Sequence, residues 1–98
     1  MIDDLIHWEV AKQNSEHGTN EHLQDGTGDL AYQEWCNYYR MRCDAAMLNK
    51  EETWADIFAE EVFEVLASKT EDELRLELIQ VAALVQRWLD AIKGRVNK

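Results

Sequence analysis

The sequence lacks proline altogether and has only four glycines, two cysteines and ten basic residues among its 98 positions. Twenty Asp and Glu residues outnumber these bases, which gives a formal net charge of −10. Nucleic-acid polymers bind through Lys and Arg that neutralise phosphates, so we expect no DNA or RNA polymer as a partner. The longest purely apolar run, Val81–Val85, is far too short to span a bilayer, and no membrane association is expected.

The N-terminal residues and the cysteines exclude further possibilities. The first ten residues contain acids but no Lys or Arg, unlike the start of a secretory signal, so the cytoplasm is the expected compartment. Cys36 and Cys43 lie seven residues apart in a segment of helical periodicity, where their Cα atoms would be about 10 Å apart. A disulfide needs Cα atoms within about 7 Å, so we interpret both cysteines as helix-packing residues.

Length and composition predict one globular domain over residues 1–98. Hydrophobic residues make up 46% and charged residues 31% of the chain, which is the balance of a folded protein rather than of a disordered one. A chain of this length buries only a modest share of its surface by itself. We therefore expect no large core within a single copy.

Periodicity and turn residues divide the chain into helical segments and one long loop, and an all-α fold is predicted. A short helix is expected over residues 3–12. Residues 13–28 hold three of the four glycines and show no periodicity, which predicts a loop that is either functional or a solvated connector. The next helix is predicted over residues 29–49, with Asp29 as its N-cap.

The predicted helix over residues 29–49 carries an apolar stripe at steps of three and four residues. Its members are Tyr32, Trp35, Cys36, Tyr39, Cys43, Ala46 and Met47. Such a stripe is typical of a helix that packs in a core. Its Trp and Tyr members could alternatively flank a flat ligand.

Two capping boxes predict the helices that follow. Thr53 precedes Asp56 by three residues, and Thr70 precedes Glu73 by the same spacing. In a capping box the Thr hydroxyl accepts a hydrogen bond from the amide three residues on, and the acid reaches back toward the cap. We therefore expect helices near residues 54–67 and 71–93. The short connection makes them antiparallel neighbours, a helical hairpin within residues 53–93.

Acidic side chains fall among apolar ones when these two helices are drawn at about 100° per residue. Glu61 lies inside the apolar arc of the first helix, and Glu64 lies beside that arc one turn further along. Glu77 lies inside the apolar arc of the second helix, with Gln80 at its edge. Three carboxylates therefore point where apolar packing is expected.

Buried carboxylates need a proton, an ion pair, solvent or a cation, because an unpartnered buried charge is costly. The nearby bases Lys69, Arg75 and Arg87 are too few to neutralise the cluster. A divalent cation answers the electrostatics best, and all-oxygen ligands favour Mg²⁺ or Mn²⁺. The alternative is that these acids line a solvated seam of a helix bundle.

The acids also form a motif. The sequence EEVFE at Glu60–Glu64, followed after twelve residues by ELIQ at Glu77–Gln80, resembles the EExxE…ExxD signature of the MazG-like nucleoside triphosphate pyrophosphohydrolases. This all-α superfamily includes dimeric dUTPases and dCTP pyrophosphatases. Further likeness to a small branch from actinobacteria and their phages lies in DGTG from Asp25, CDAA from Cys43 and TWADI from Thr53. The resemblance covers about residues 13–93.

The resemblance implies a site and a reaction. Glu61, Glu64 and Glu77 would bind Mg²⁺, with Gln80 at the fourth position, where the family has Asp. Gln offers only a neutral carbonyl oxygen, so the site loses one negative charge and some affinity. Glu60 would either position the attacking water or support the metal ligands without touching the ion. The reaction would be hydrolysis of an NTP or dNTP between the α and β phosphates, which gives NMP and pyrophosphate.

A nucleotide site also needs groups that hold the base and the phosphates. Amide, imidazole and carboxylate groups on the loop and aromatic rings on the next helix could contact the base: Asn20, His22, Asp25, Trp35 and Tyr39. The candidates for phosphate contacts are Arg87, Lys93 and Arg95.

Four tryptophans and two wide apolar arcs predict assembly, because one hairpin covers only part of those arcs. We expect a homodimer or a dimer of dimers in which the hairpins pack into a four-helix bundle. Two alternatives to the enzyme remain at this stage. One is a relative that binds nucleotide or metal with impaired catalysis. The other is an acidic helical protein-interaction module that mimics DNA.

Overall fold

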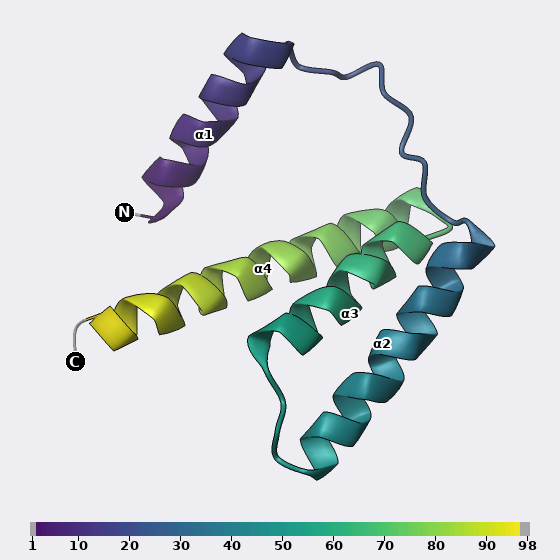
Figure 1. The fold of residues 1–98 in the computed structure, drawn as a ribbon. Coiled ribbons are helices and arrows are strands. Elements are labelled where there is room, and N and C mark those ends of the chain that lie inside the picture. Colours follow the sequence, from purple (N-terminus) through teal and green to yellow (C-terminus); the bar gives the residue numbers. More distant parts are fainter. Residues whose placement is uncertain (1, 97–98) are drawn as a thin grey trace.

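The computed structural model describes residues 2–96 and is all-helical over that range (Figure 1). Its helices are α1 (Ile2–His17), α2 (Leu30–Leu48), α3 (Trp54–Ala67) and α4 (Glu71–Val96). The prediction of an all-α fold is confirmed for the described residues. None of these helices has a stretch apolar enough, over sufficient length, to cross a membrane.

The N-terminal helix is longer than the sequence pattern indicates. The predicted loop over residues 13–28 is wrong for residues 13–17, which continue α1 as far as His17. Polar residues without glycine or proline do not break a helix. The chain leaves it at Gly18, whose φ of +74° is the left-handed conformation of a helix C-cap. The Gly18 amide donates to the carbonyl of Asn14 at 2.9 Å and closes that end.

The loop that follows α1 is hydrogen-bonded to α3 near the loop's C-terminal end. Gly28 has a φ of +90°, and its amide donates to the carbonyl of Leu66 at 2.8 Å. A Cβ atom here would lie 3.3 Å from the carbonyl oxygen of Ser68, so glycine also allows the close approach. Asp29 then caps α2, as predicted, because its carboxylate accepts from the amide of Ala31 at 2.8 Å.

Both predicted Thr caps are confirmed. The Thr53 hydroxyl oxygen accepts from the amide of Asp56 at 3.2 Å, and that of Thr70 accepts from the amide of Glu73 at 3.1 Å. The Glu73 carboxylate reaches one residue further back than a capping box requires and accepts from the amide of Lys69 at 2.9 Å. These local bonds place the starts of α3 and α4 where the sequence predicts them.

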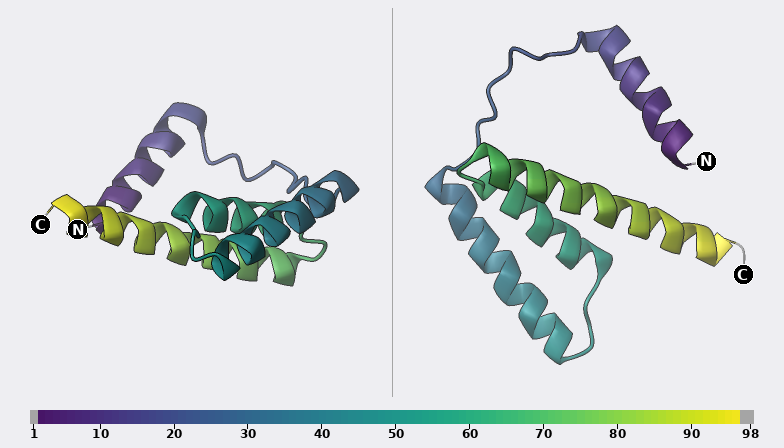
Figure 2. Two further views of the ribbon diagram at one scale, coloured as in Figure 1. Left: turned by 60° about the horizontal axis from the view of Figure 1, so that its bottom comes forward. Right: turned by 180° about the vertical axis from the view of Figure 1, so that it is seen from behind.

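α2, α3 and α4 form a single layer in which α3 lies between the other two (Figure 1). α3 and α4 run antiparallel and are joined by the short turn over residues 68–70, as predicted. The principal extents of the molecule are 45 × 43 × 20 Å, and Figure 2 shows the layer close to edge-on in its left view. Most side chains of α3, which lies between α2 and α4, are half-buried rather than fully buried.

The core is correspondingly small. Among the described residues, the buried hydrophobic side chains are Cys36 and Cys43 of α2, Ala67 of α3 and Leu84 of α4. Aromatic rings add to the packing: Trp54 stacks on Trp88 at a centroid distance of 6.1 Å, between α3 and α4. The prediction that both cysteines are helix-packing residues is confirmed, and neither forms a disulfide.

α1 stands apart from the layer at the far end of the loop (Figures 1 and 2). Its apolar side chains remain largely in solvent, and Trp8 is 77% exposed. A shallow apolar groove lies between Leu5, Ile6 and Val10 of α1 and Leu89 of α4. The chain therefore has one part whose helices pack against each other, α2–α4, and one part, α1, whose apolar side chains the other helices scarcely cover.

Candidate metal centre

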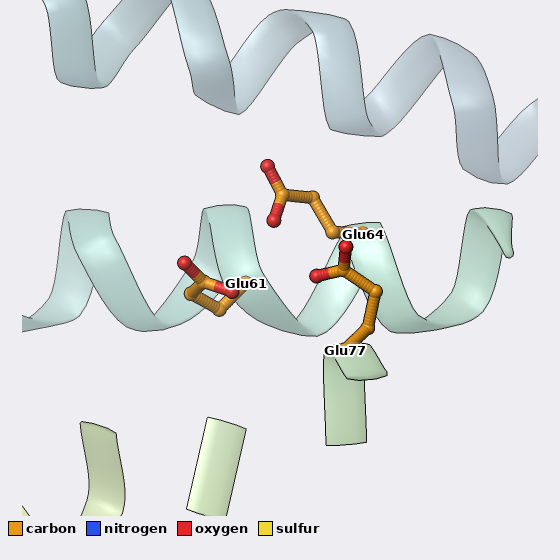
Figure 3. Close-up of side chains that lie close together, drawn as sticks. All are labelled: Glu61, Glu64 and Glu77. Atoms are coloured by element: carbon orange, nitrogen blue, oxygen red, sulfur yellow. The ribbon is translucent and has the colours of Figure 1, made fainter. Parts of the chain in front are cut away.

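Three glutamates converge where α3 and α4 lie side by side. Glu61 and Glu64 are one helical turn apart on α3, and Glu77 is in the second turn of α4, so the hairpin brings all three together (Figure 3). One carboxylate oxygen from each lies within 4.8 Å of the others. We call Glu61, Glu64 and Glu77 the carboxylate triad. Each is half-buried.

Two oxygens of the triad have no partner. Glu61 Oε2 and Glu77 Oε2 are shielded from solvent, and neither accepts a hydrogen bond from any described residue. A buried carboxylate oxygen without a donor or a cation loses its hydration with nothing in return. The two orphaned atoms lie on different helices and belong to the same cluster. They indicate a position that a cation or a proton would occupy.

The triad is also difficult to ionise completely. Burial, followed by the charge of the neighbouring Glu64, raises the pKa of Glu61 to about 7. Burial likewise raises the pKa of Glu77, and Glu64 adds to that effect. At neutral pH the cluster therefore retains a proton for part of the time unless another positive charge replaces it.

The donor set fits a hard divalent cation. Three carboxylates offer oxygen ligands, which Mg²⁺ and Mn²⁺ prefer over the nitrogen and sulfur ligands of zinc sites. Neighbouring ligand oxygens on octahedral Mg²⁺ lie about 3 Å apart, since each is about 2.1 Å from the ion. The triad oxygens, all within 4.8 Å of one another, therefore surround a space of about the size of one such ion. Among the described residues, this is the single group of three or more metal-ligating side chains.

A polar cavity of about 190 Å³ opens beside the triad. All three helices of the layer contribute to it: Gln33, Cys36 and Arg40 from α2, Glu64, Ala67 and Ser68 near the end of α3, and Glu73 and Glu77 from α4. Small hydrophilic ligands suit this space, because acids, an arginine and an amide share its wall.

Arg40 is the functional candidate that the sequence analysis missed. Its Nη2 lies 3.5 Å from Glu64 Oε1, and its Nε lies 3.9 Å from Glu60 Oε1. A signal for it was present in the sequence. Cys36 and Cys43 mark the side of α2 that faces a neighbour, and Arg40 follows Cys36 by one helical turn, so it falls beside that side.

Glu60 and Gln80 lie outside the carboxylate triad. Glu60 is directed toward α2, where Arg40 pairs with it, and its side chain is 22% exposed. Gln80 is exposed on α4, one turn beyond Glu77, and does not line the cavity. The four metal positions implied by the EExxE…ExxD signature therefore comprise three converging carboxylates and one outlying amide.

The candidates for base and phosphate contacts are spread over the molecule. Trp35 belongs to an aromatic cluster with Tyr38, Tyr39 and Phe63, which lines no part of the polar cavity. The Arg87 guanidinium lies 5.5 Å from the centre of the Trp54 ring. Trp35 and Arg87 both lie on helices of the layer, yet neither lines the polar cavity beside the triad.

Side chains on the loop and at the end of α4 are also distant from the cavity wall. Asn20, with a φ of +56°, and His22 are exposed in the loop. Asp25 borders a separate shallow hollow with the first turns of α4. Lys93 and Arg95 belong to the last turn of α4, and Lys93 lies about 24 Å along the helix from Glu77.

We compared the chain with models of protein families, with curated proteins and with solved structures, and nothing matches it. The class of protein must therefore be argued from the triad, the cavity and the motif alone.

Proposed function

We propose that this protein is a Mg²⁺-dependent nucleoside triphosphate pyrophosphohydrolase, which converts an NTP or dNTP to NMP and pyrophosphate in the cytoplasm. The observation that carries the proposal is the carboxylate triad, with two buried oxygens that have no hydrogen-bond donor. The EExxE…ExxQ motif, whose acids make up that triad, supports the same reaction class.

Each residue of the site has a proposed task. Glu61, Glu64 and Glu77 hold Mg²⁺ or Mn²⁺, which neutralises phosphate charge and activates a water when bound. Gln80 turns inward as a neutral fourth ligand. Glu60 lies beside the triad, next to Arg40, and orients the attacking water through its carboxylate. Asn20, His22, Asp25, Trp35 and Arg87 remain candidates for nucleotide contacts.

The proposal includes assembly into a homodimer or a dimer of dimers. The layer of α2, α3 and α4 is a single sheet of helices with no second layer of described residues against it, so large apolar side chains remain uncovered. Those on α4 that are more than half exposed are Leu76, Leu78 and Ile79. Packing of the α3–α4 hairpins of two chains into a four-helix bundle would cover such side chains and enclose the nucleotide. Sedimentation on dilution tests this: an active species of single-chain mass would contradict it.

A panel assay tests the reaction. The purified chain is incubated with each NTP and dNTP in Mg²⁺ or Mn²⁺, and NMP and pyrophosphate are both measured. We expect stoichiometric release from at least one nucleotide, none with EDTA, and none from Glu61→Gln. Release of inorganic phosphate alone would contradict cleavage between the α and β phosphates.

Gln80 supports a second candidate, a relative that binds metal and nucleotide with impaired catalysis. The side chain is exposed and lacks the charge of the family's Asp. Such a protein would show a metal- and nucleotide-dependent rise in melting temperature without pyrophosphate release. A protein indifferent to both ligands would instead match an acidic helical interaction module.

A further inference from the structure

We propose that Arg40 is the phosphate-binding residue of this site, and that it becomes available when Glu64 turns from the guanidinium to a bound divalent cation. The inference rests on the proposed function, and it assigns the triphosphate to the polar cavity beside the triad. Arg40 would thus be a built-in counter-ion in the unliganded protein and a substrate contact in the loaded one.

The charge of the cavity requires such a group. Its wall carries the carboxylates of Glu64, Glu73 and Glu77, and Arg40 supplies the one cationic side chain among its lining residues. A triphosphate adds further negative charge to a chain whose formal charge is already −10. Metal ions compensate part of this repulsion, and a guanidinium can compensate more while it binds two phosphate oxygens at once.

The geometry of Arg40 suits an exchangeable contact. Its distances to Glu64 and Glu60, 3.5 and 3.9 Å, are longer than those of a well-formed charged hydrogen bond. The side chain is 49% exposed, so solvent competes for the same donors. A guanidinium that is half exposed and this far from Glu64 can exchange one oxygen partner for another, because the contact is longer than a well-formed charged hydrogen bond.

The other arginines with described contacts are engaged elsewhere. Arg42 pairs with Asp56 and lies over the Tyr38 ring, away from the polar cavity. Arg75 pairs with Glu71 within α4. Arg87 lies over Trp54. Arg40 therefore differs from these three arginines because it lines the polar cavity, whereas they do not.

This double role predicts that loss of Arg40 weakens tripolyphosphate binding without weakening Mn²⁺ binding. In Arg40→Ala, Glu64 loses its competing cation, so Mn²⁺ alone should bind as tightly as in the wild type or more tightly. Inorganic tripolyphosphate, added to the Mn²⁺-loaded protein, should bind roughly tenfold to a hundredfold more weakly, which is the loss expected for a charged phosphate contact. A merely structural arginine would move both affinities in the same direction.

Calorimetry with Mn²⁺ alone, and then with tripolyphosphate in excess Mn²⁺, tests the inference without turnover. Arg75→Ala is the matched control and should leave both affinities unchanged. Arg40→Gln keeps most of the side-chain length, should behave as Arg40→Ala does, and replaces it if that variant does not fold. Arg40→Lys keeps the charge without the planar fork and should retain part of the tripolyphosphate affinity.

Two results overturn the inference, and they are distinguishable from failure of the proposed function. Unchanged tripolyphosphate affinity in both Arg40→Ala and Arg40→Gln, with normal Mn²⁺ binding, rejects the phosphate role alone. Weaker Mn²⁺ binding in these variants assigns Arg40 to support of the metal ligands and also rejects it. A wild-type chain that binds no Mn²⁺ rejects the proposed function together with this inference.

Discussion

The α3–α4 hairpin and the α1 segment differ in how their apolar side chains are used. In the hairpin, Trp54 stacks on Trp88 and Leu84 is buried, so each helix covers part of the other. In α1, Leu5 and Trp8 are mostly exposed, and only a shallow groove connects the helix with α4. Helix formation is thus common to both regions, whereas packing within one chain belongs to the hairpin.

The difference between these regions gives a physical reason for the place of the candidate site. Side chains that bind a cation need helices or strands that are fixed by packing, because mobile ligands bind the ion more weakly. The triad uses two helices that are capped by Thr53 and Thr70 and packed against each other. The loop side chains have no comparable support, because the backbone hydrogen bond from the described loop residues to the layer is the one made by Gly28.

The largest expected effect comes from a cavity at the hairpin interface. Leu84 is 4% exposed, so Leu84→Ala should reduce the free energy of unfolding by about 2–5 kcal/mol. Leu5→Ala, on α1, should cost about 0.5 kcal/mol or less. Urea denaturation of both variants measures the difference. If Leu5→Ala lowered the free energy of unfolding as much as Leu84→Ala, a second chain would have to cover α1. The difference in packing between α1 and the hairpin would then apply only to a single chain.

The next effect concerns the triad. Glu61→Gln removes a carboxylate that crowds Glu64 and Glu77, so the metal-free variant should melt at a higher temperature than the wild type. Its Mn²⁺ affinity should fall by roughly tenfold to a hundredfold or more, at least the loss seen when groups that only support a metal ligand are removed. Glu9→Gln, on α1, is the matched control. Equal Mn²⁺ affinities in wild type and Glu61→Gln would place the metal elsewhere.

A smaller effect is a pH dependence specific to the hairpin. The folded protein holds the pKa of Glu61 at about 7, above the value of about 4.5 for an unhindered Glu, so the folded state binds more protons between these pH values. The contribution of Glu61 to stability must therefore fall as pH rises through that window.

Mn²⁺ should reverse this trend, because the ion replaces the proton and its binding strengthens as pH rises. Denaturation at pH 5 and pH 8, with and without Mn²⁺, measures both effects in wild type and Glu61→Gln. Subtracting the free energy of unfolding of Glu61→Gln from that of the wild type isolates the contribution of Glu61. In the absence of metal, wild-type stability that rose relative to that of the variant between pH 5 and pH 8 would contradict the raised pKa.

The smallest expected effect is at the fourth position of the motif. Gln80→Asp adds a carboxylate one turn from Glu77 and should tighten Mn²⁺ binding severalfold, if the side chain turns toward the triad. Gln13→Asp adds the same charge to exposed α1 and controls for the change in net charge. Calorimetry on both variants decides whether Gln80 belongs to the ligand set: identical affinities would exclude it.

The helix starts were predictable because their causes are local. Asp29, Thr53 and Thr70 each accept a hydrogen bond from an amide two or three residues away, and these spacings are visible in the sequence. The start of the loop was misplaced because polar residues over 13–17 resemble a loop in composition, while the helix continues until Gly18 provides a left-handed residue. The position of Gly18, the first residue suited to end the helix, was a better guide to the end of α1 than the composition of residues 13–17.

Local rules therefore account for the helices α2, α3 and α4 and for the placement of Glu61 and Glu64 on one helical face, since both follow from short-range hydrogen bonds and a period of about 3.6 residues. The packing of the helices against one another set which side chains meet across them. It brought Glu77 to that pair, set Arg40 against Glu64, and left Trp35 and Arg87 outside the cavity. The reason is physical: contacts between helices depend on their relative rotation and separation, which interhelical packing sets and no local spacing encodes.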